Sequence, residues 1–478
     1  MGISSVPVYV AMSLQGLLLA SWALAAPIDG PQPSFELPEE PTRQPPALAI
    51  QAADVNGNVW ARDPRLQHPD VRRASHALEA GQVNQCIEHL KSAAGDHPAM
   101  PPAEVLLAYL YLAESRWREG LSALESAAAS DRNNPEIYAS AGQLALMQGR
   151  NLDASVHFDM ALRLETPASW PDEVKRRFSI TCLRGLATIA ERRADWQGAE
   201  SMLRQWVQLD PDNAQLLDRW GKSLWLIGKS DEALTQFTRS HKLDPKLNPP
   251  ELSIAALHAS RSNMDEAKQW YTTALEKYPE DARVFLEFGG ALLVAGQHDE
   301  AQKMLDQAQQ IVTDNAPQAA DISLMQGLLA LTKSDFKSAE RYFDEVLKHS
   351  PGHAQALRCL PLVLVEQEDQ AKHKRAQQIA TFQARRFPGS AASLSTLGWV
   401  HFRTGEAEGA EQCLRRAAAL SADGDTLFFL AQVLVDRGDG EDAKRAVHAL
   451  EAKLQGSEFF PMRSAAQDWI QSVAVLFE

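Results

Sequence analysis

Cysteine is scarce in this chain, with four residues among 478. Disulfide-stabilised folds need a much denser set, so a disulfide framework is excluded. No two cysteines are close enough in sequence for the paired spacing of a zinc site, so we expect no metal centre. The four are Cys86, Cys182, Cys359 and Cys413. Cys86 stands where other segments carry alanine, and we expect it to be a buried structural thiol.

Basic residues are also in deficit, because 47 Lys and Arg face 62 Asp and Glu and leave a formal net charge of −15. Contacts to phosphate need Lys and Arg in excess. The balance therefore argues against a general nucleic-acid-binding protein, and we expect no nucleic-acid partner.

Catalytic motifs are missing as well. The chain has no G-x-x-x-x-G-K-[ST] loop, no G-x-G-x-x-G turn, no H-E-x-x-H pair and no G-x-S-x-G elbow. The acidic run at 438–442 lacks the ligand spacing of a calcium loop. We therefore expect a protein that is not an enzyme and needs no cofactor.

The amino terminus is apolar, and residues 6–26 contain no charged side chain. Ala23-Leu24-Ala25 has the small-x-small form of a signal-peptidase site, which predicts a cleaved signal peptide over residues 1–25. No basic side chain precedes it, so an uncleaved membrane anchor formed by residues 6–26 is the alternative. Either interpretation predicts an exported protein of the periplasm or cell envelope. A cytoplasmic protein with a misinterpreted amino terminus is the third possibility.

Residues 26–66 differ from the rest in composition, with seven prolines between positions 27 and 46. Proline donates no amide hydrogen and restricts its neighbours to extended conformations. We expect a Pro-rich, largely disordered linker.

From residue 67 the chain repeats itself at intervals of 34 residues. The clearest copy, residues 214–245, has Gly221 inside a first helical pattern and Gly228 at its end. Ala233 and Phe237 follow, four apart on a second helical pattern, and Pro245 closes the copy. The same landmarks recur on both sides, so each copy predicts a pair of amphipathic helices.

This pattern resembles the tetratricopeptide repeat, a 34-residue unit of two antiparallel helices. About eleven units start near residues 67, 101, 135, 180, 214, 248, 282, 320, 354, 391 and 424. The resemblance implies an all-α fold, a right-handed tetratricopeptide α-solenoid over residues 67–456 whose stacked units share one core. Residues 457–478 then predict a C-terminal capping helix.

Two places depart from the period. Extra residues at 166–173 predict either a tolerated surface loop or a contact loop led by Trp170. Pro361 falls inside a first helix, where proline costs about 3 kcal/mol or kinks the helix, so we expect a bend or a local break.

The resemblance implies that the first helices line a concave groove that takes an extended peptide or a partner helix. Asp218 and Lys222 stand where a carboxylate-clamp member would carry its Lys and Asn set, so such a clamp is not expected. Aromatic residues at helical spacing are usually core between adjacent helices, and among these we expect Trp225 and Trp399 to be the most exposed. The candidate groove residues are Tyr109, Gln143, Met147, Arg184, Arg192, Arg219, Lys222, Trp225, Trp399 and Phe402.

Elimination leaves two classes of function. The first is a protein-interaction scaffold of the cell envelope, which touches a membrane only through an uncleaved amino terminus. The alternative is a glycan-binding or polysaccharide-guiding module of a surface-polysaccharide export or assembly system. A row of exposed tryptophans would favour the glycan, and a mixed apolar and charged groove would favour a peptide.

Overall fold

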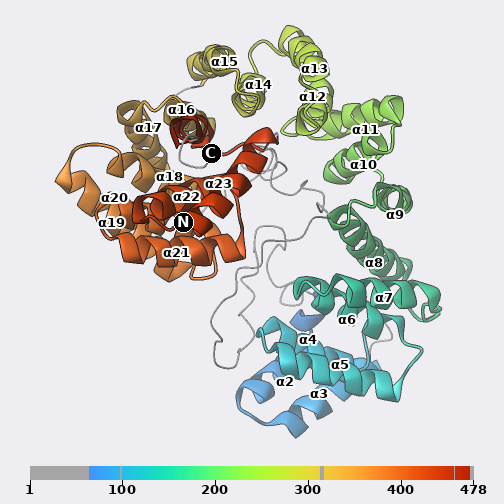
Figure 1. Ribbon diagram of the computed structural model, residues 1–478. Coiled ribbons are helices and arrows are strands. Elements are labelled where there is room, and N and C mark those ends of the chain that lie inside the picture. The colour runs from blue at the N-terminus through green and yellow to red at the C-terminus, as the bar shows by residue number, and fades with distance from the viewer. Residues whose placement is uncertain (1–63, 97–99, 313–316, 457, 474–478) are drawn as a thin grey trace. The chain divides into compact units, whose positions relative to one another are not determined.

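The computed structural model describes residues 64–96, 100–312, 317–456 and 458–473 (Figure 1). The predicted signal peptide and the predicted linker up to residue 63 lie outside these ranges. Within them every regular element is a helix, so the all-α prediction is confirmed. None of the helices in these ranges is long and apolar enough to cross a membrane.

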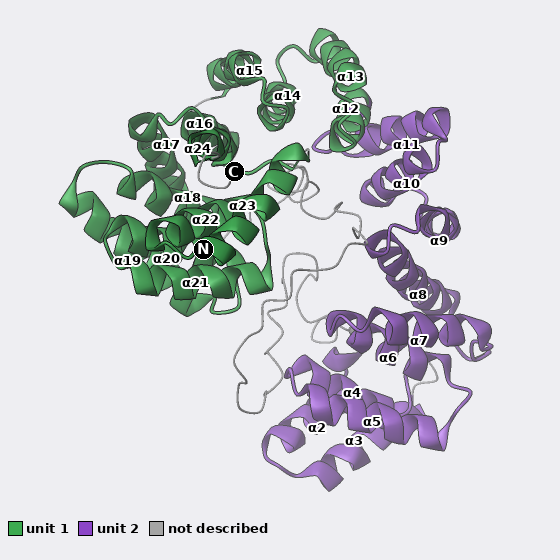
Figure 2. Cartoon of the chain, viewed as in Figure 1, with its two compact units in different colours: residues 1–35, 251–478 green, residues 36–250 purple. Residues whose placement is uncertain are grey.

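The described helices fall into two compact units, which Figure 2 distinguishes by colour. One contains α2–α11 and the other contains α12–α24; we call them the N-terminal unit and the C-terminal unit. Each has core clusters of its own, formed by buried Leu, Ala and aromatic side chains. A short 3-10 turn, η1 (Pro64–Gln67), precedes α2 and takes up the end of the predicted linker.

The N-terminal unit consists of five helix pairs. They are α2 (Pro69–Glu79) with α3 (Val83–Asp96), α4 (Ala103–Ala113) with α5 (Trp117–Ser130), α6 (Pro135–Met147) with α7 (Asn151–Arg163), α8 (Asp172–Arg192) with α9 (Trp196–Leu209), and α10 (Ala214–Leu226) with α11 (Ser230–Leu243).

The C-terminal unit consists of six pairs and one further helix. They are α12 (Pro250–Ser260) with α13 (Met264–Lys277), α14 (Ala282–Val294) with α15 (His298–Ile311), α16 (Pro317–Thr332) with α17 (Phe336–His349), α18 (Ala354–Val365) with α19 (Gln370–Arg386), α20 (Ala391–Arg403) with α21 (Ala407–Leu420), α22 (Gly424–Arg437) with α23 (Gly440–Gln455), and finally α24 (Arg463–Val473).

The eleven pairs match the predicted units. Ten of the first helices begin within three residues of the predicted start. The fourth is the exception, because α8 begins at Asp172, about two helical turns before the predicted residue 180.

Close helix crossings explain the small residues of the repeat. Gly221 on α10 faces Phe237 on α11, and a Cβ added to Gly221 would lie 2.8 Å from the ring. Gly142 and Phe158 repeat this arrangement, again sixteen residues apart and with the same 2.8 Å. Real Cβ atoms do not approach this closely, so glycine lets the two helices of a pair pack against a large ring.

The turn inside each pair needs a second special residue. In ten of the eleven described pairs one turn residue has φ between 54° and 90°, a left-handed conformation that favours glycine. Six of these residues are glycines, including Gly228, and four are Ser115, Ala194, Ser262 and Ser334. The α18–α19 pair has no such residue.

Within each unit the first helices form one layer and the second helices another. First helices of consecutive pairs contact each other, as α6 contacts α8 and as α20 contacts α18 and α22. Each second helix also contacts the next first helix, for example α7 with α8. In Figure 1, α8 and α10 lie on one side of the N-terminal unit, and α9 and α11 lie on the other.

For each of the two irregular segments, one of the two alternative expectations was wrong. Trp170 does not lead a contact loop: it is 6% exposed and packs edge-on against Phe178, with ring centroids 5.5 Å apart. Residues 166–171 lie outside the helices, as the surface-loop alternative predicts, and α8 begins at Asp172 and runs for 21 residues. Pro361 does not break α18 either, because the helix runs through it and its ring is buried with the neighbouring apolar side chains. Burial of that apolar stretch offsets the lost amide hydrogen bond.

Candidate functional site

The first-helix layer of the N-terminal unit brings six of the predicted residues onto three neighbouring helices. Gln143 and Met147 lie on α6, Arg184 and Arg192 on α8, and Arg219 and Lys222 on α10. The 34-residue period relates α8 to α10, because Arg184 and Asp218 occupy equivalent places on these helices, as do Thr188 and Lys222. We call the surface formed by these residues the α6–α10 face.

Arg219 is held in place by its neighbours. Its Nε and Nη2 donate to the two carboxylate oxygens of Glu191 on α8, at 3.1 and 2.8 Å. Nη2 also donates to Oγ1 of Thr188 at 3.2 Å, and the guanidinium lies 5.5 Å from the ring centroid of Trp206. A bidentate, half-buried ion pair holds the guanidinium in one orientation and balances its charge. Through these contacts Arg219 joins α10 to α8 and α9.

The side chains of Arg184 and Lys222 form no ion pair with any described residue. Both side chains are exposed, and no carboxylate among the described residues lies within ion-pair distance of either. Although the Arg184 side chain reaches solvent, burial by surrounding atoms lowers its pKa, and the charge of Arg219 lowers it further. The face therefore presents two exposed cations that form no ion pair with the described residues, and of the two Lys222 interacts electrostatically with Asp218.

Asp218 gives the same face a titratable group. Burial raises the pKa of its carboxyl from 3.8 to about 6, and Lys222 opposes this shift. The net charge of the face therefore becomes more positive as the pH falls through about 6.

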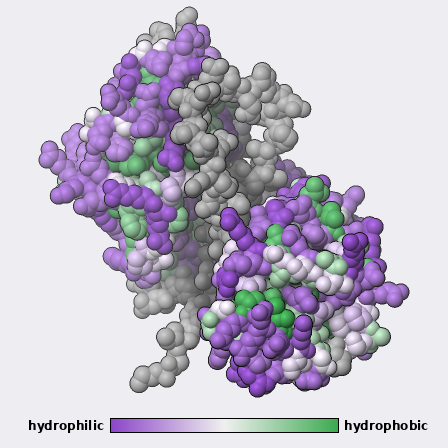
Figure 3. Space-filling model, turned by 90° about the horizontal axis from the view of Figure 1, so that it is seen from below, coloured by the Kyte–Doolittle hydropathy of each residue, from purple (hydrophilic) through white to green (hydrophobic). Residues whose placement is uncertain are grey.

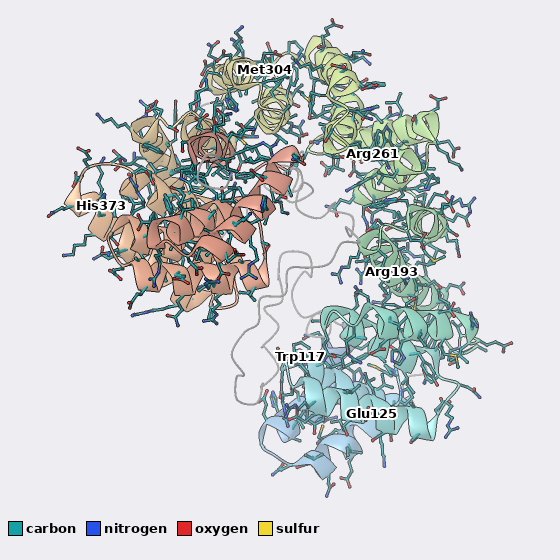
Figure 4. The ribbon with its side chains drawn as sticks, in the orientation of Figure 1. Trp117, Glu125, Arg193, Arg261, Met304 and His373 are labelled. Atoms are coloured by element: carbon teal, nitrogen blue, oxygen red, sulfur yellow. The ribbon has the colours of Figure 1, made fainter. Side chains whose placement is uncertain are left out.

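The ends of α6 and α8 complete the α6–α10 face. Gln143 and Met147 are half-buried, and Arg192 is exposed. Nη1 of Arg192 donates to Oδ1 of Asn151 at 3.3 Å. The next residue, Arg193, is the exposed C-cap of α8 and is labelled in Figure 4. Positive charge thus extends to the end of this helix.

Two other predicted residues of the N-terminal unit are buried. Tyr109 donates from its hydroxyl to Oε1 of Glu136 at 2.8 Å and lies 3.0 Å from Oγ of Ser140. Arg65 of η1 forms an ion pair with the same glutamate. Trp225 is 7% exposed, so the expectation that it is exposed was wrong. An aromatic ring at helical spacing on a first helix is thus buried here, as such rings usually are.

The last two predicted residues, Trp399 and Phe402, lie in the C-terminal unit. Trp399 is 3% exposed, so its expected exposure was wrong too. Its ring stacks on Phe429 with centroids 4.5 Å apart, and its Nε1 donates to Oε1 of Glu366 at 2.9 Å. Phe402 is half-buried beside it, with centroids 5.5 Å apart.

Sequence reasoning missed several charged residues on first helices. Glu191 orients Arg219, and Glu366 accepts from Trp399 while it pairs with Arg403 at 3.0 Å. Asp425, on α22, is buried, and burial followed by the charge of Asp423 raises its pKa to about 7. A charge inside an otherwise apolar first helix is the signal that identifies Asp425 in the sequence.

The four cysteines are free thiols, and three of them are buried. Cys86 is buried as predicted, and burial raises its pKa to about 11. Within the described ranges no three His, Cys, Asp or Glu residues are grouped so that they could hold a metal ion. The face drawn in Figure 3 is mainly hydrophilic, with apolar residues gathered in small separate patches.

Comparison with protein families gives four matching segments. Models described as tetratricopeptide repeat match residues 77–144 and 258–325, residues 324–371, and residues 390–422. These segments cover helices of both compact units.

Similar proteins are distant. The cellulose synthase operon protein C of Escherichia coli is 24% identical over 212 residues, which are 42% of this chain and 18% of that protein. Tetratricopeptide repeat protein 8 of Caenorhabditis elegans is 26% identical over 153 residues, 32% of this chain and 29% of that protein. The chain thus matches less than a third of the length of either relative.

Two solved structures are also similar. Yeast Tom70 has 12% identity and a TM-score of 0.36, with 85% of this chain and 95% of that chain covered. The Cut9–Hcn1 hetero-tetramer of APC/C has 13% identity and a TM-score of 0.39, with 84% and 88% covered.

Proposed function

The chain is a tetratricopeptide-repeat protein, and we propose that it is a non-catalytic scaffold whose α6–α10 face binds an acidic segment of a partner protein. Proteins of this family generally bind protein partners, as an extended peptide or a helix lying along the first helices.

The pair Arg184 and Lys222 carries this proposal. In a chain with a net charge of −15, two adjacent first helices keep exposed cations that form no ion pair with a described carboxylate, although Asp218 offsets part of the Lys222 charge. Arg219, which is paired with Glu191, lies close enough to Arg184 for its charge to lower the pKa of that guanidinium. A carboxylate from a partner would relieve the repulsion between Arg184 and Arg219, and such charge-assisted bonds are strong and directional.

A peptide suits this face better than a sugar chain. Tryptophans stacking on sugar rings would have to be exposed in a row, and Trp225 and Trp399 are buried. The second candidate function, guiding a surface polysaccharide, is supported by the similarity to a cellulose synthase operon protein. Because that similarity covers 18% of the relative, we keep polysaccharide guiding as the second candidate and not the first.

We place the scaffold in the cell envelope on the basis of the apolar segment 6–26. Substitution of Ala25→Asp should block cleavage of a signal peptide and leave a longer protein in the membrane fraction. An unchanged length in the cytoplasmic fraction, for both wild type and variant, would contradict export.

Capture of the partner tests the binding face. We would use the full chain as bait in crosslinked envelope extract, beside the double variant Arg184→Ala, Lys222→Ala. The matched control is Arg118→Ala, Lys242→Ala, which removes two exposed cations from second helices α5 and α11.

We expect one protein to be recovered by wild type and control and to fall about tenfold with the face variant. Equal recovery by all three baits would remove the α6–α10 face from the proposal. Recovery of no protein, with retention of the bait on an envelope polysaccharide, would favour the second candidate function.

A further inference from the structure

The last helix, α24, does more than cover the final repeat. It contacts α22 and α23 of the last pair, and it also contacts α16, the first helix three pairs earlier. Both α16 and α22 belong to the first-helix layer of the C-terminal unit. Figure 2 shows α24 beside α16. The helix therefore lies against the first-helix layer, where a partner would be expected to bind.

Residues 459–462, directly before α24, form an anchor whose apolar side chains are buried. Phe459, Phe460 and Met462 are buried, and Phe460 has no exposed surface. Its ring occupies the space left by Gly424, since a Cβ at that glycine would overlap it. The amide of Met462 donates to Oδ1 of Asp425 at 3.1 Å. This short segment is thus fitted into the start of α22.

Arg463 closes the turn that carries the anchor. Its Nη1 donates to the carbonyl of Glu458 at 2.7 Å, and its Nη2 donates to the carbonyls of Leu454 and Gly456 at 2.6 and 2.8 Å. Lys453 pairs with the Glu458 side chain at 2.8 Å. The start of α24 is therefore fixed to the end of α23.

The rest of α24 buries fewer side chains than this anchor does. Ala466 is its one fully buried residue, whereas Trp469 and Ile470 are half-buried and Gln467 and Asp468 are exposed. Trp469 meets Phe428 edge-on at 5.9 Å. Few buried apolar contacts mean a low free energy of local opening.

Phe428, the aromatic residue that Trp469 contacts, belongs to a larger aromatic cluster. Phe428 lies 6.2 Å from Trp399 and 5.8 Å from Phe429, centroid to centroid, and Phe402 adjoins Trp399. Trp469 is the contribution of α24 to this cluster. Opening of α24 would leave Phe428 without its edge-on partner, and a binding helix with an aromatic side chain would replace it.

We propose that α24 is a displaceable occupant of the first-helix layer of the C-terminal unit, hinged after the Phe459–Met462 anchor. The ligand that replaces it is an amphipathic helix with an aromatic residue followed by an aliphatic one, as in Trp469–Ile470. This inference concerns a different surface from the α6–α10 face and does not depend on it.

Binding of a labelled peptide to the full chain tests the proposal. The probe is a synthetic peptide of residues 463–473, added to wild type and to the variant Trp469→Ala. We expect the variant, whose own α24 is loosened, to bind the peptide at least about tenfold more tightly than wild type. A peptide with alanine in place of its tryptophan should not bind.

The matched control is Gln467→Ala, an exposed position on the same helix, which should behave as wild type. No binding to a Trp469→Ala protein of wild-type helicity, or equal binding to all three proteins, would overturn the proposal. Should Trp469→Ala fail to fold, hydrogen exchange of wild type decides. Amides of α24 must exchange at least about tenfold faster than those of α22, and equal protection would refute a displaceable helix.

Discussion

Gly228 and Ala194 occupy the same place in consecutive repeats, 34 residues apart, and both have positive φ, at 86° and 54°. A Cβ added to Gly228 would have no heavy atom within 4 Å. The cost of a larger residue there would therefore come from the backbone conformation and not from a steric clash. Non-glycine residues lose roughly 1 kcal/mol in this left-handed conformation. Among the described helix pairs there are thus four turns where a non-glycine residue bears a strain that glycine avoids in the other six.

Exchange of these two residues should change stability in opposite directions. Gly228→Ala should lower the free energy of unfolding by about 1 kcal/mol, and Ala194→Gly should raise it by up to about 1 kcal/mol. Urea unfolding followed by circular dichroism measures both. Loss of stability in both variants would mean that packing, rather than φ, governs these turns.

A pair of core residues gives a second prediction at this scale. Gly221→Ala should destabilise by about 1–3 kcal/mol, because its Cβ would overlap the Phe237 ring. The added change Phe237→Leu should recover part of the loss, since the chain itself pairs Ala108 with Leu124 at the same spacing. A double-mutant cycle reports the coupling energy, and additive losses would contradict the contact.

Asp218 makes stability depend on pH. Its folded-state pKa of about 6 exceeds the ordinary 3.8, so the folded chain binds this proton more tightly than the unfolded chain between those values. Stability therefore falls as pH rises through about 6. Asp321 and Asp425, whose pKa values burial raises to about 6 and about 7, act in the same direction.

Asp218→Asn should reduce the difference in unfolding free energy between pH 5 and pH 7.5 by an amount on the order of 1 kcal/mol. The exposed Asp212→Asn serves as control. The same variant should also abolish any strengthening of partner binding below pH 6, because the charge of the α6–α10 face no longer changes there. An unchanged pH dependence of stability would rule out Asp218 as its source.

At the scale of helices, the sequence predicts the pairs well and the side-chain exposure poorly. Glycine or alanine opposite a ring or leucine, sixteen residues later, is a local signal, and Gly142–Phe158 and Gly221–Phe237 both repeat it. The exposure of Trp399 depends on contacts with other repeats, because its ring stacks on Phe429 and its Nε1 donates to Glu366. No spacing within one repeat encodes those contacts. Trp225 and Trp399 were placed on the correct helices but wrongly expected to be exposed.

The long helix α8 illustrates the same limit. Its additional turns fall outside the 34-residue period, so the repeat pattern did not predict the residue at which α8 begins. The packing of Trp170 against Phe178 explains why the chain becomes helical so early, at Asp172. Exposure was predicted better for the charged residues of the candidate site than for its aromatic residues, because Arg184 and Lys222 are exposed on first helices.

Trp170→Ala distinguishes a packing role from a contact role. We expect it to destabilise the N-terminal unit by about 3 kcal/mol, the usual cost of truncating a buried tryptophan. Partner capture by the fraction that remains folded should be unchanged. Wild-type stability with loss of the captured protein would restore the contact-loop interpretation.

On the scale of the whole molecule, the two compact units have separate core clusters. Stability in repeat proteins is a sum of repeat and nearest-neighbour terms. Gly221→Ala should therefore accelerate amide exchange in α8–α11 and leave α14–α23 close to wild type. Hydrogen exchange with mass spectrometry measures this directly, and uniform acceleration across both units would show that the chain unfolds as one cooperative body.

The sixteen-residue pairing of small and large residues also bears on how this chain can change in length over evolution. Each helix pair completes its own crossing and its own turn, so gain or loss of one whole pair leaves every remaining ring with its small partner. An insertion of half a pair would instead leave an apolar helix without a counterpart. Variation in length is therefore expected in steps of one repeat, and additions such as the early turns of α8 are confined to the ends of helices.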